Sequence, residues 1–212
     1  MRDRVAALVA ADQPVLVEMR RHLHAHPELS SQEHATTAWI GQHLRDLGLA
    51  PKRLDVGTGL VCDIAIGDVD AGSPVVALRA DIDALAMPDE KDVGYRSTVD
   101  GVAHACGHDA HTTVVLGAAR ALVALAPRSD VAGTVRLVFE PAEESVPGGA
   151  VDILARIIGE RLSTQYGHNV IVDNKPGASG HLGAQLVAKA PGDGYTLMVG
   201  TIGIHAAYAS YS

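Results

Sequence analysis

Short apolar runs alternate along this chain with longer segments of helical period, and this alternation limits the possible folds more than any other feature. Residues 60–66, 74–80 and 133–139 are apolar and partly β-branched, which favours strands. Residues 3–26 and 111–126 carry apolar residues at helical spacing. The run at 74–80 is almost continuously apolar, so we expect it to be buried on both faces of a sheet. Strands that alternate with long helices predict a layered α/β fold with a sheet rich in parallel strands.

Capping and turn signals predict the remaining elements. Ser30 and Glu33 have the spacing of a capping box, which predicts that a second helix begins there and ends near Gly48. A Pro-Gly-Gly turn at 147–149 separates this part from the rest of the chain. Beyond the turn we expect helices at 151–165 and 182–190 and strands at 169–172 and 195–199.

The charge balance and the cysteine content exclude several classes of function. Lys and Arg number 17 against 25 Asp and Glu, a formal net charge of −8. This balance argues against binding to nucleic acid or to an anionic membrane, because both need clustered positive charge. Cys62 and Cys106 are too few for a disulfide framework, which favours a reducing compartment. No stretch approaches the roughly 20 apolar residues of a membrane span, and residues 5–11 fit an amphipathic helix better than a signal peptide, so we expect a cytoplasmic chain.

The stretch H-A-C-G-H-D-A-H at 104–111 concentrates residue types that bind metals. Cys106 and His108 are separated by one glycine, so a thiolate and an imidazole can reach the same point. A thiolate together with an imidazole suits Zn, Mn, Co or Ni. Asp109 is a candidate for orienting a ligand histidine. Cys62 has no such neighbours, and we expect it to be a buried apolar residue.

Acidic residues stand at the ends of two predicted strands. Glu143 and Glu144 follow one of them, and Asp81 and Asp83 follow another. Carboxylates at the carboxyl end of a strand lie where α/β sheets place their active sites. Adjacent acids can divide the chemistry, one binding metal and the other moving a proton, although paired Glu residues on a turn are also common as solvated surface.

Three histidines alternate near the end of the first predicted helix. His22, His24 and His26 are two residues apart, so they cannot all share one helical face. We therefore expect a structural or surface role for them.

Four segments in the first 150 residues occur in the order typical of one enzyme family. They are R-R-H-L-H-A-H-P-E-L-S-S-Q-E (20–33), V-A-L-R-A-D-I-D-A-L (76–85), H-A-C-G-H-D-A-H-T-T (104–113) and F-E-P-A-E-E (139–144). Together they resemble the two-metal amidohydrolases of the aminoacylase/carboxypeptidase superfamily, in particular the branch of hippurate hydrolases and indole-acetyl-amino-acid hydrolases. The resemblance implies part of the catalytic domain of a three-layer di-metal hydrolase.

The resemblance also implies roles for individual residues. It makes Cys106, His108 and Glu144 ligands of two divalent ions (Mn, Zn, Co or Ni), Glu143 the general base and Asp83 an active-site acid. The implied reaction is hydrolysis of the amide bond of an N-acyl amino acid, in which the metals stabilise the oxyanion.

The sequence departs from this family in its length. The family's catalytic domain is interrupted by a lid domain and completed by C-terminal strands with another histidine ligand, and this sequence carries neither. His168 falls where a further family histidine would be expected, although its neighbours follow a different pattern. We therefore expect little or no turnover from this chain alone.

From about residue 147 the sequence resembles a second family. Segments 147–156, 169–184 and 187–197 are similar to the Bug-type periplasmic solute receptors of tripartite tricarboxylate uptake. This resemblance implies part of a periplasmic-binding-protein-like α/β lobe, in which the N-termini of helices hold a carboxylate. The candidate ligand-binding residues are Gly149, Asp152, Gly177 and Gly180, and the alternative is that these glycines only form turns.

The two resemblances together predict a fusion of an amidohydrolase part, residues 1–147, to a receptor-like lobe, residues 148–212. Three interpretations stay open: an amidohydrolase that acts on small N-acyl amino acids, a carboxylate-binding module, or a fusion product without function. We also expect self-association, because an incomplete sheet leaves an apolar edge that recruits strands from other chains.

Overall fold

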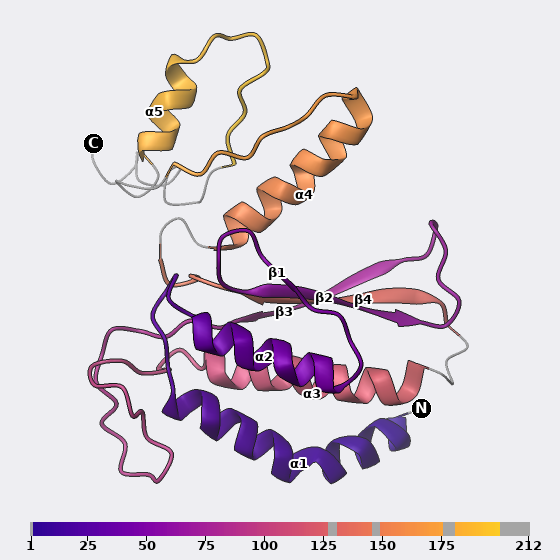
Figure 1. The fold of residues 1–212 in the computed structure, drawn as a ribbon, viewed down its shortest axis with the longest axis vertical. Coiled ribbons are helices and arrows are strands. Elements are labelled where there is room, and N and C mark those ends of the chain that lie inside the picture. Colours follow the sequence, from indigo (N-terminus) through magenta and orange to yellow (C-terminus); the bar gives the residue numbers. More distant parts are fainter. Residues whose placement is uncertain (1, 127–130, 146–148, 176–180, 200–212) are drawn as a thin grey trace. The chain divides into compact units, whose positions relative to one another are not determined.

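The computed structural model describes residues 2–126, 131–145, 149–175 and 181–199 and divides the chain into two compact units (Figure 1). The second unit, Glu143–Ser212, contains α4 (Gly149–Tyr166) and α5 (His181–Lys189). The first unit, Met1–Ala142, contains α1 (Arg2–Ala25), α2 (His34–Asp46), β1 (Lys52–Arg53), β2 (Leu60–Ile66), β3 (Val75–Asp81), α3 (His108–Leu125) and β4 (Gly133–Glu140).

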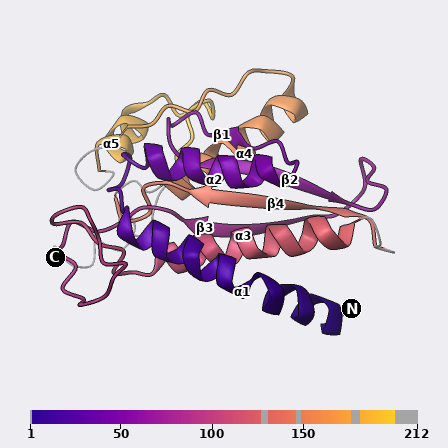
Figure 2. The ribbon, with the colours of Figure 1, turned by 60° about the horizontal axis from the view of Figure 1, so that its bottom comes forward.

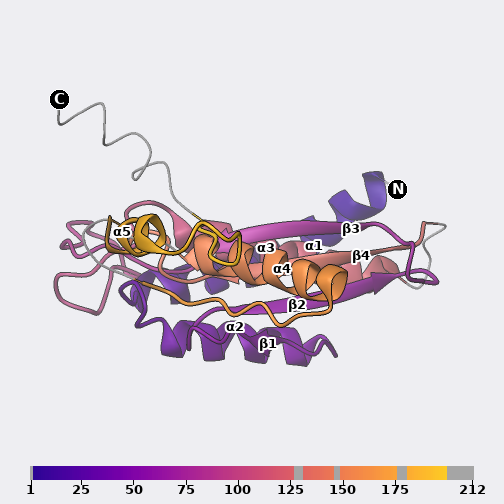
Figure 3. The same ribbon diagram turned by 90° about the horizontal axis from the view of Figure 1, so that it is seen from above.

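β3 and β4 form a parallel pair at one side of the sheet. Within the described residues the strand order is β1–β2–β4–β3, and Figure 3 shows β4 between β2 and β3. β4 pairs in parallel with β3, with Val76 opposite Val135, and antiparallel with β2, with Cys62 opposite Leu137. The expectation of a sheet rich in parallel strands is therefore wrong. In the part of the chain that the structure describes, only the connection from β3 to β4 carries a helix, and parallel neighbours need such a crossover.

Helices cover one face of this sheet in two layers. Figures 1 and 2 show α2 and α3 against the sheet and α1 packed on α3. Trp39 of α2 stacks on His22 of α1, with ring centroids 4.8 Å apart. The core between these elements consists of apolar side chains that are shielded from solvent, among them Ile40, Leu44, Leu60, Leu116, Leu137 and Phe139.

β3 is buried only at its carboxyl end. Val75 and Val76 are each 58% exposed, whereas Ala80 and Asp81 are buried. The prediction that the run at 74–80 is buried on both faces is wrong, because β3 is an edge strand of the described sheet and its first half is exposed.

The start of α2 differs from the predicted capping box. Glu28 accepts hydrogen bonds from the main-chain N–H groups of Ala35 (3.1 Å) and Thr36 (2.7 Å), which are unpaired within the helix. The Glu33 carboxylate instead accepts from the N–H of Ala142, and the Ser30 hydroxyl donates to Asp83. The predicted box is therefore wrong, because both of its side chains are used for longer-range contacts and Glu28 stabilises the first turn.

The second unit is built mainly from helices in its described residues. α4 and α5 confirm the helices expected at 151–165 and 182–190. Residues 169–172 and 195–199 are described without strand structure, so both strand predictions are wrong. A short apolar run becomes a strand only if it finds a pairing partner, and sequence periodicity does not supply one. Among the described helices, none has the length and hydropathy needed to cross a membrane.

Candidate metal centre

Polar side chains gather where β3 and β4 end and where α3 begins. Asp81 is the last residue of β3, Glu140 the last residue of β4 and His108 the first residue of α3. Because β3 and β4 are parallel, their carboxyl ends lie at the same edge of the sheet. The crossover from β3 leads into α3 at this edge, which is the position of active sites in α/β proteins.

His108 is buried and held in one orientation by Asp83. The Nδ1 atom of His108 lies 2.9 Å from the main-chain oxygen and 3.2 Å from Oδ1 of Asp83. A carbonyl oxygen only accepts, so Nδ1 carries the proton and donates it. The other ring nitrogen, Nε2, lies 3.6 Å from Oδ2 of Asp81. A histidine whose one N–H is tied to a carbonyl or carboxylate has the arrangement typical of a metal ligand.

The carboxylates around His108 also control its charge. Burial alone would lower the pKa of His108, but the hydrogen bond to Asp83 and the negative charge of Asp81 outweigh this effect and raise the pKa to about 9. Without an ion, His108 is therefore cationic at neutral pH and is stabilised by the two carboxylates. A metal ion that binds at Nε2 has to displace this proton.

Asp81 joins His108 to a second imidazole. Nδ1 of His111 lies 2.6 Å from Oδ1 of Asp81, and the Thr112 hydroxyl donates to the main-chain oxygen of Asp81. One ligand atom from each of Asp81, His108 and His111 lies within 4.8 Å of the others. Two imidazoles and a carboxylate suit Zn and other borderline divalent ions. Sequence reasoning assigned no role to His111, although its spacing of three from His108 on a helix predicts a shared face.

The structure changes the roles expected for Asp83 and Asp109. Asp83 is fully buried, contacts His108 and accepts a hydrogen bond from the Ser30 hydroxyl at 2.7 Å. Asp109 does not orient the ligand histidine as expected: its Oδ2 lies 2.7 Å from Nδ1 of His24. Successive residues on a helix point about 100° apart, so neighbours in sequence face different partners.

The predicted ligands Cys106 and Glu144 and the predicted base Glu143 are exposed. Cys106 precedes Gly107, which is the N-cap of α3. Glu143 and Glu144 open the second unit, directly after Ala142. The assignment of Cys106, His108 and Glu144 as one ligand set therefore stays a prediction. Cys62 is buried as expected, and burial raises the pKa of its thiol.

His104 is a buried histidine that the sequence analysis left without a role. Within the described residues, neither of its ring nitrogens has a hydrogen-bond partner. Burial lowers the pKa of His104 to about 4, so this ring is neutral at physiological pH. Buried polar atoms without a protein partner are uncommon, and a bound water molecule is the usual explanation.

The residues predicted for other ligands lie in the second unit. His168 follows α4 and is exposed, so its role as a metal ligand stays a prediction. Gly149 is the first residue of α4, and the Asp152 carboxylate contacts the side chains of Arg156 and Asn174. Gly177 and Gly180 lie outside the described residues.

Curated relatives match about two thirds or more of the chain. It is 51% identical over 144 residues to "Putative glutamate–cysteine ligase 2-3" of Rhodococcus jostii, which covers 68% of this chain and 17% of that protein. It is 40% identical to N-acetyl-L-cysteine deacetylase of Bacillus subtilis and 41% identical to IAA-amino acid hydrolase ILR1-like 4 of Arabidopsis thaliana, covering 68% and 73% of this chain. The chain spans only 35% and 34% of the length of these two relatives.

A solved structure and a family model agree with these relatives. The chain superposes on Bacillus subtilis YXEP protein, a dinuclear metal-binding peptidase from the M20 family, with a TM-score of 0.64 and 39% identity, covering 70% of this chain and 40% of that one. The model of peptidase family M20/M25/M40 matches residues 77–210, across the boundary at 147/148 where we expected a receptor-like lobe. These matches give the predicted receptor segment and fusion no support. The chain belongs to the peptidase family M20/M25/M40.

Proposed function

We propose that this chain is a metal-dependent amidohydrolase segment that acts on the amide bond of N-acyl amino acids. The observation that carries the proposal is the orientation of His108, whose Nδ1 is tied to Asp83 while Nε2 faces Asp81. Two relatives support the substrate class by their names, an N-acetyl-L-cysteine deacetylase and an IAA-amino acid hydrolase. Because the chain spans about a third of their length, its activity and its cytoplasmic location are proposals.

The donors in the first unit fit a divalent ion. Asp81, His108 and His111 offer a carboxylate and two imidazoles within 4.8 Å of one another. We propose that Cys106 and Glu144 add a thiolate and a second carboxylate, a set that Mn, Zn, Co and Ni all accept. Ions bound there would polarise the scissile carbonyl and promote ionisation of the attacking water.

The chain's own residues would move the proton and hold the ligands in place. We assign Glu143 to take the proton of the attacking water and to deliver it to the leaving amine nitrogen, which lets the amide bond break. Asp83 is buried against His108 and would act through it, by fixing its orientation.

The test is release of free amino acid from a panel of N-acyl amino acids, with Mn, Zn, Co or Ni added in turn. We expect low but metal-dependent turnover that Glu143→Gln abolishes. Glu160→Gln on α4 removes a comparable carboxylate elsewhere and should leave turnover unchanged. Turnover that survives Glu143→Gln would contradict the assigned base, and absence of turnover with every ion would contradict the proposed activity.

The alternative, a carboxylate-binding module, makes the opposite prediction. If the chain is such a module, it should show no turnover, and small carboxylates should raise its melting temperature in the absence of metal. The Asp152 side chain is already bound by Arg156 and Asn174, which leaves it less able to serve an incoming ligand. A response to neither metal nor carboxylate would favour a chain without function.

A further inference from the structure

The sequence segment at 20–33 resembles the amidohydrolases, but none of its residues has a place in the chemistry proposed above. In the structure, two of its side chains meet the start of α3. Nδ1 of His24 lies 2.7 Å from Oδ2 of Asp109, and Nε of Arg20 lies 2.8 Å from the same oxygen. Asp109 is the residue directly after His108, so the contact reaches the turn that carries the candidate ligands.

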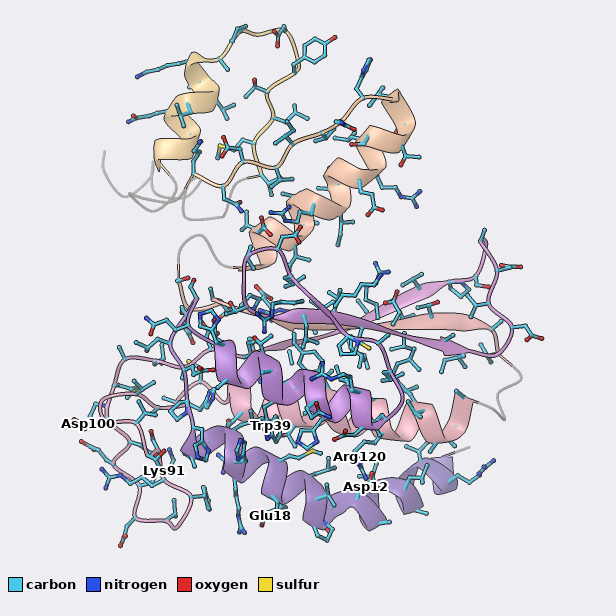
Figure 4. The ribbon with its side chains drawn as sticks, in the orientation of Figure 1. Asp12, Glu18, Trp39, Lys91, Asp100 and Arg120 are labelled. Atoms are coloured by element: carbon cyan, nitrogen blue, oxygen red, sulfur yellow. The ribbon has the colours of Figure 1, made fainter. Side chains whose placement is uncertain are left out.

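His24 also contacts the long loop that joins β3 to α3. Its Nε2 lies 3.2 Å from Oδ2 of Asp89, and the Lys91 ammonium lies 3.1 Å from the other oxygen of Asp89. The N–H of Ser97 donates to Asp89 as well, and this hydrogen bond, followed by those from Lys91, holds the pKa of Asp89 well below its usual value. Figure 4 shows Lys91 on this loop, beside the end of α1. One imidazole thus bridges a carboxylate of the loop and a carboxylate of α3.

Because the cluster of His24, Asp89 and Asp109 is buried, the loss of any one contact in it is costly. The side chains of His24 and Asp109 are 1% and 0% exposed. A buried carboxylate that loses its partner keeps the cost of desolvation without the compensating attraction. The first turn of α3 would respond by moving Asp109 toward water, and His108 would move with it.

Asp109 also accepts a hydrogen bond at the start of α3. The N-cap, Gly107, has a φ of 88° and no side chain that could cap the helix. Oδ1 of Asp109 accepts the N–H of Ala110 at 2.8 Å, while its Oδ2 faces α1. A negative charge in the first turn also stabilises a helix through its dipole. His108 and His111 lie on the other side of this turn and contact Asp81.

From these contacts we propose that His24, together with Arg20, is a positioning residue for the metal centre. It holds Asp109, and through Asp109 it keeps the imidazoles of His108 and His111 directed at Asp81. The inference rests on the proposed metal centre and extends it to a residue of α1 outside the proposed ligand set.

The packing of α1 on α3 has a second anchor at the far end, which provides a matched control. Two of the three guanidinium nitrogens of Arg120, Nε and Nη2, donate to the carboxylate of Asp12, at 2.7 and 2.8 Å. Figure 4 shows this pair between α1 and α3. A variant that breaks the far anchor should weaken helix packing without disturbing the turn at His108.

The experiment compares His24→Gln with Asp12→Asn in the full chain, using Co²⁺ as the probe. We expect His24→Gln to weaken Co²⁺ binding by about 10–100-fold, the range typical of groups that support metal ligands. Asp12→Asn should lower the melting temperature and leave Co²⁺ affinity within about twofold of the original protein. Arg20→Gln should give a smaller loss of affinity, because Asp109 keeps its contact with His24.

Hydrogen exchange provides a readout that does not depend on the metal. His24→Gln should speed exchange of the amides at 108–113 relative to those at 119–125, and Asp12→Asn should not. Equal Co²⁺ affinity in both variants, or faster exchange that is uniform along α3, would overturn the positioning role. His108→Ala separates this result from the proposed metal centre: if that variant binds Co²⁺ as well as the original protein, the ligand assignment fails, whatever His24 does.

Discussion

Metal binding should become tighter as the pH rises from 7 to 9, because an incoming ion competes with the proton on His108. The pKa of this buried histidine is raised to about 9, so only about one molecule in 100 has a neutral ring at pH 7. Displacing the proton costs about 3 kcal/mol at pH 7, from roughly 1.4 kcal/mol for each of two pH units. Apparent affinity should therefore rise about tenfold per pH unit up to pH 9 and then level off.

Calorimetry in buffers of different ionisation enthalpy measures both the affinity and the protons released. Cys106→Ala isolates the imidazole, and in that variant we expect one proton to be released per ion at pH 7. The original protein should release a second proton if the Cys106 thiol also binds the ion, because only the thiolate is a ligand. Asp83→Asn removes a charge that raises the pKa of His108, so its affinity should depend less steeply on pH. An affinity that stays flat between pH 7 and 9 would refute the reasoning.

Three further predictions concern single sites. Cys106→Ala should bind much less metal than the original protein under limiting metal, and equal metal contents by elemental analysis would remove Cys106 from the ligand set. Phe139→Ala empties a fully buried site in β4 and should lower the free energy of unfolding by about 3–5 kcal/mol in urea titration. Val76→Lys places a charge on the exposed part of β3, next to Val75, and should reduce the mass seen by light scattering if that strand drives self-association.

Most helices and strands of the first unit could be predicted from the sequence, whereas the neighbours against which they pack or pair could not. The spacing of apolar residues and the β-branched residues place β2, β3, α3 and β4 correctly, because each of these segments carries a clear apolar pattern. Strand pairing depends on which apolar runs lie side by side in the fold. The sequence alone therefore does not predict the mixed sheet. The exposure of Val76 depends on the same global arrangement. The weaker runs at 169–172 and 195–199 show the same limit, because neither forms a strand.

The candidate site could be predicted in its residue types but not in its geometry. The spacing of Cys106 and His108 indicates metal chemistry, and the structure gives His108 the surroundings of a ligand. Which acid orients it could not be predicted, because Asp109 directly follows His108 in the sequence, whereas Asp83 lies 25 residues before it. Only the fold shows that Asp109 faces α1 while Asp83 faces the imidazole.

The first unit's candidate ligands come from one supersecondary element. Asp81 ends β3, and His108 and His111 lie in the first turn of α3, so all three belong to a single crossover between parallel strands. Metal binding by these donors therefore depends on contacts that the first unit makes within itself. In the proposed reaction, hydrolysis would depend in addition on Glu143, which belongs to the second unit. Binding and turnover should thus be separable in this chain: variants that disturb the second unit should lose turnover while Asp81, His108 and His111 still hold an ion.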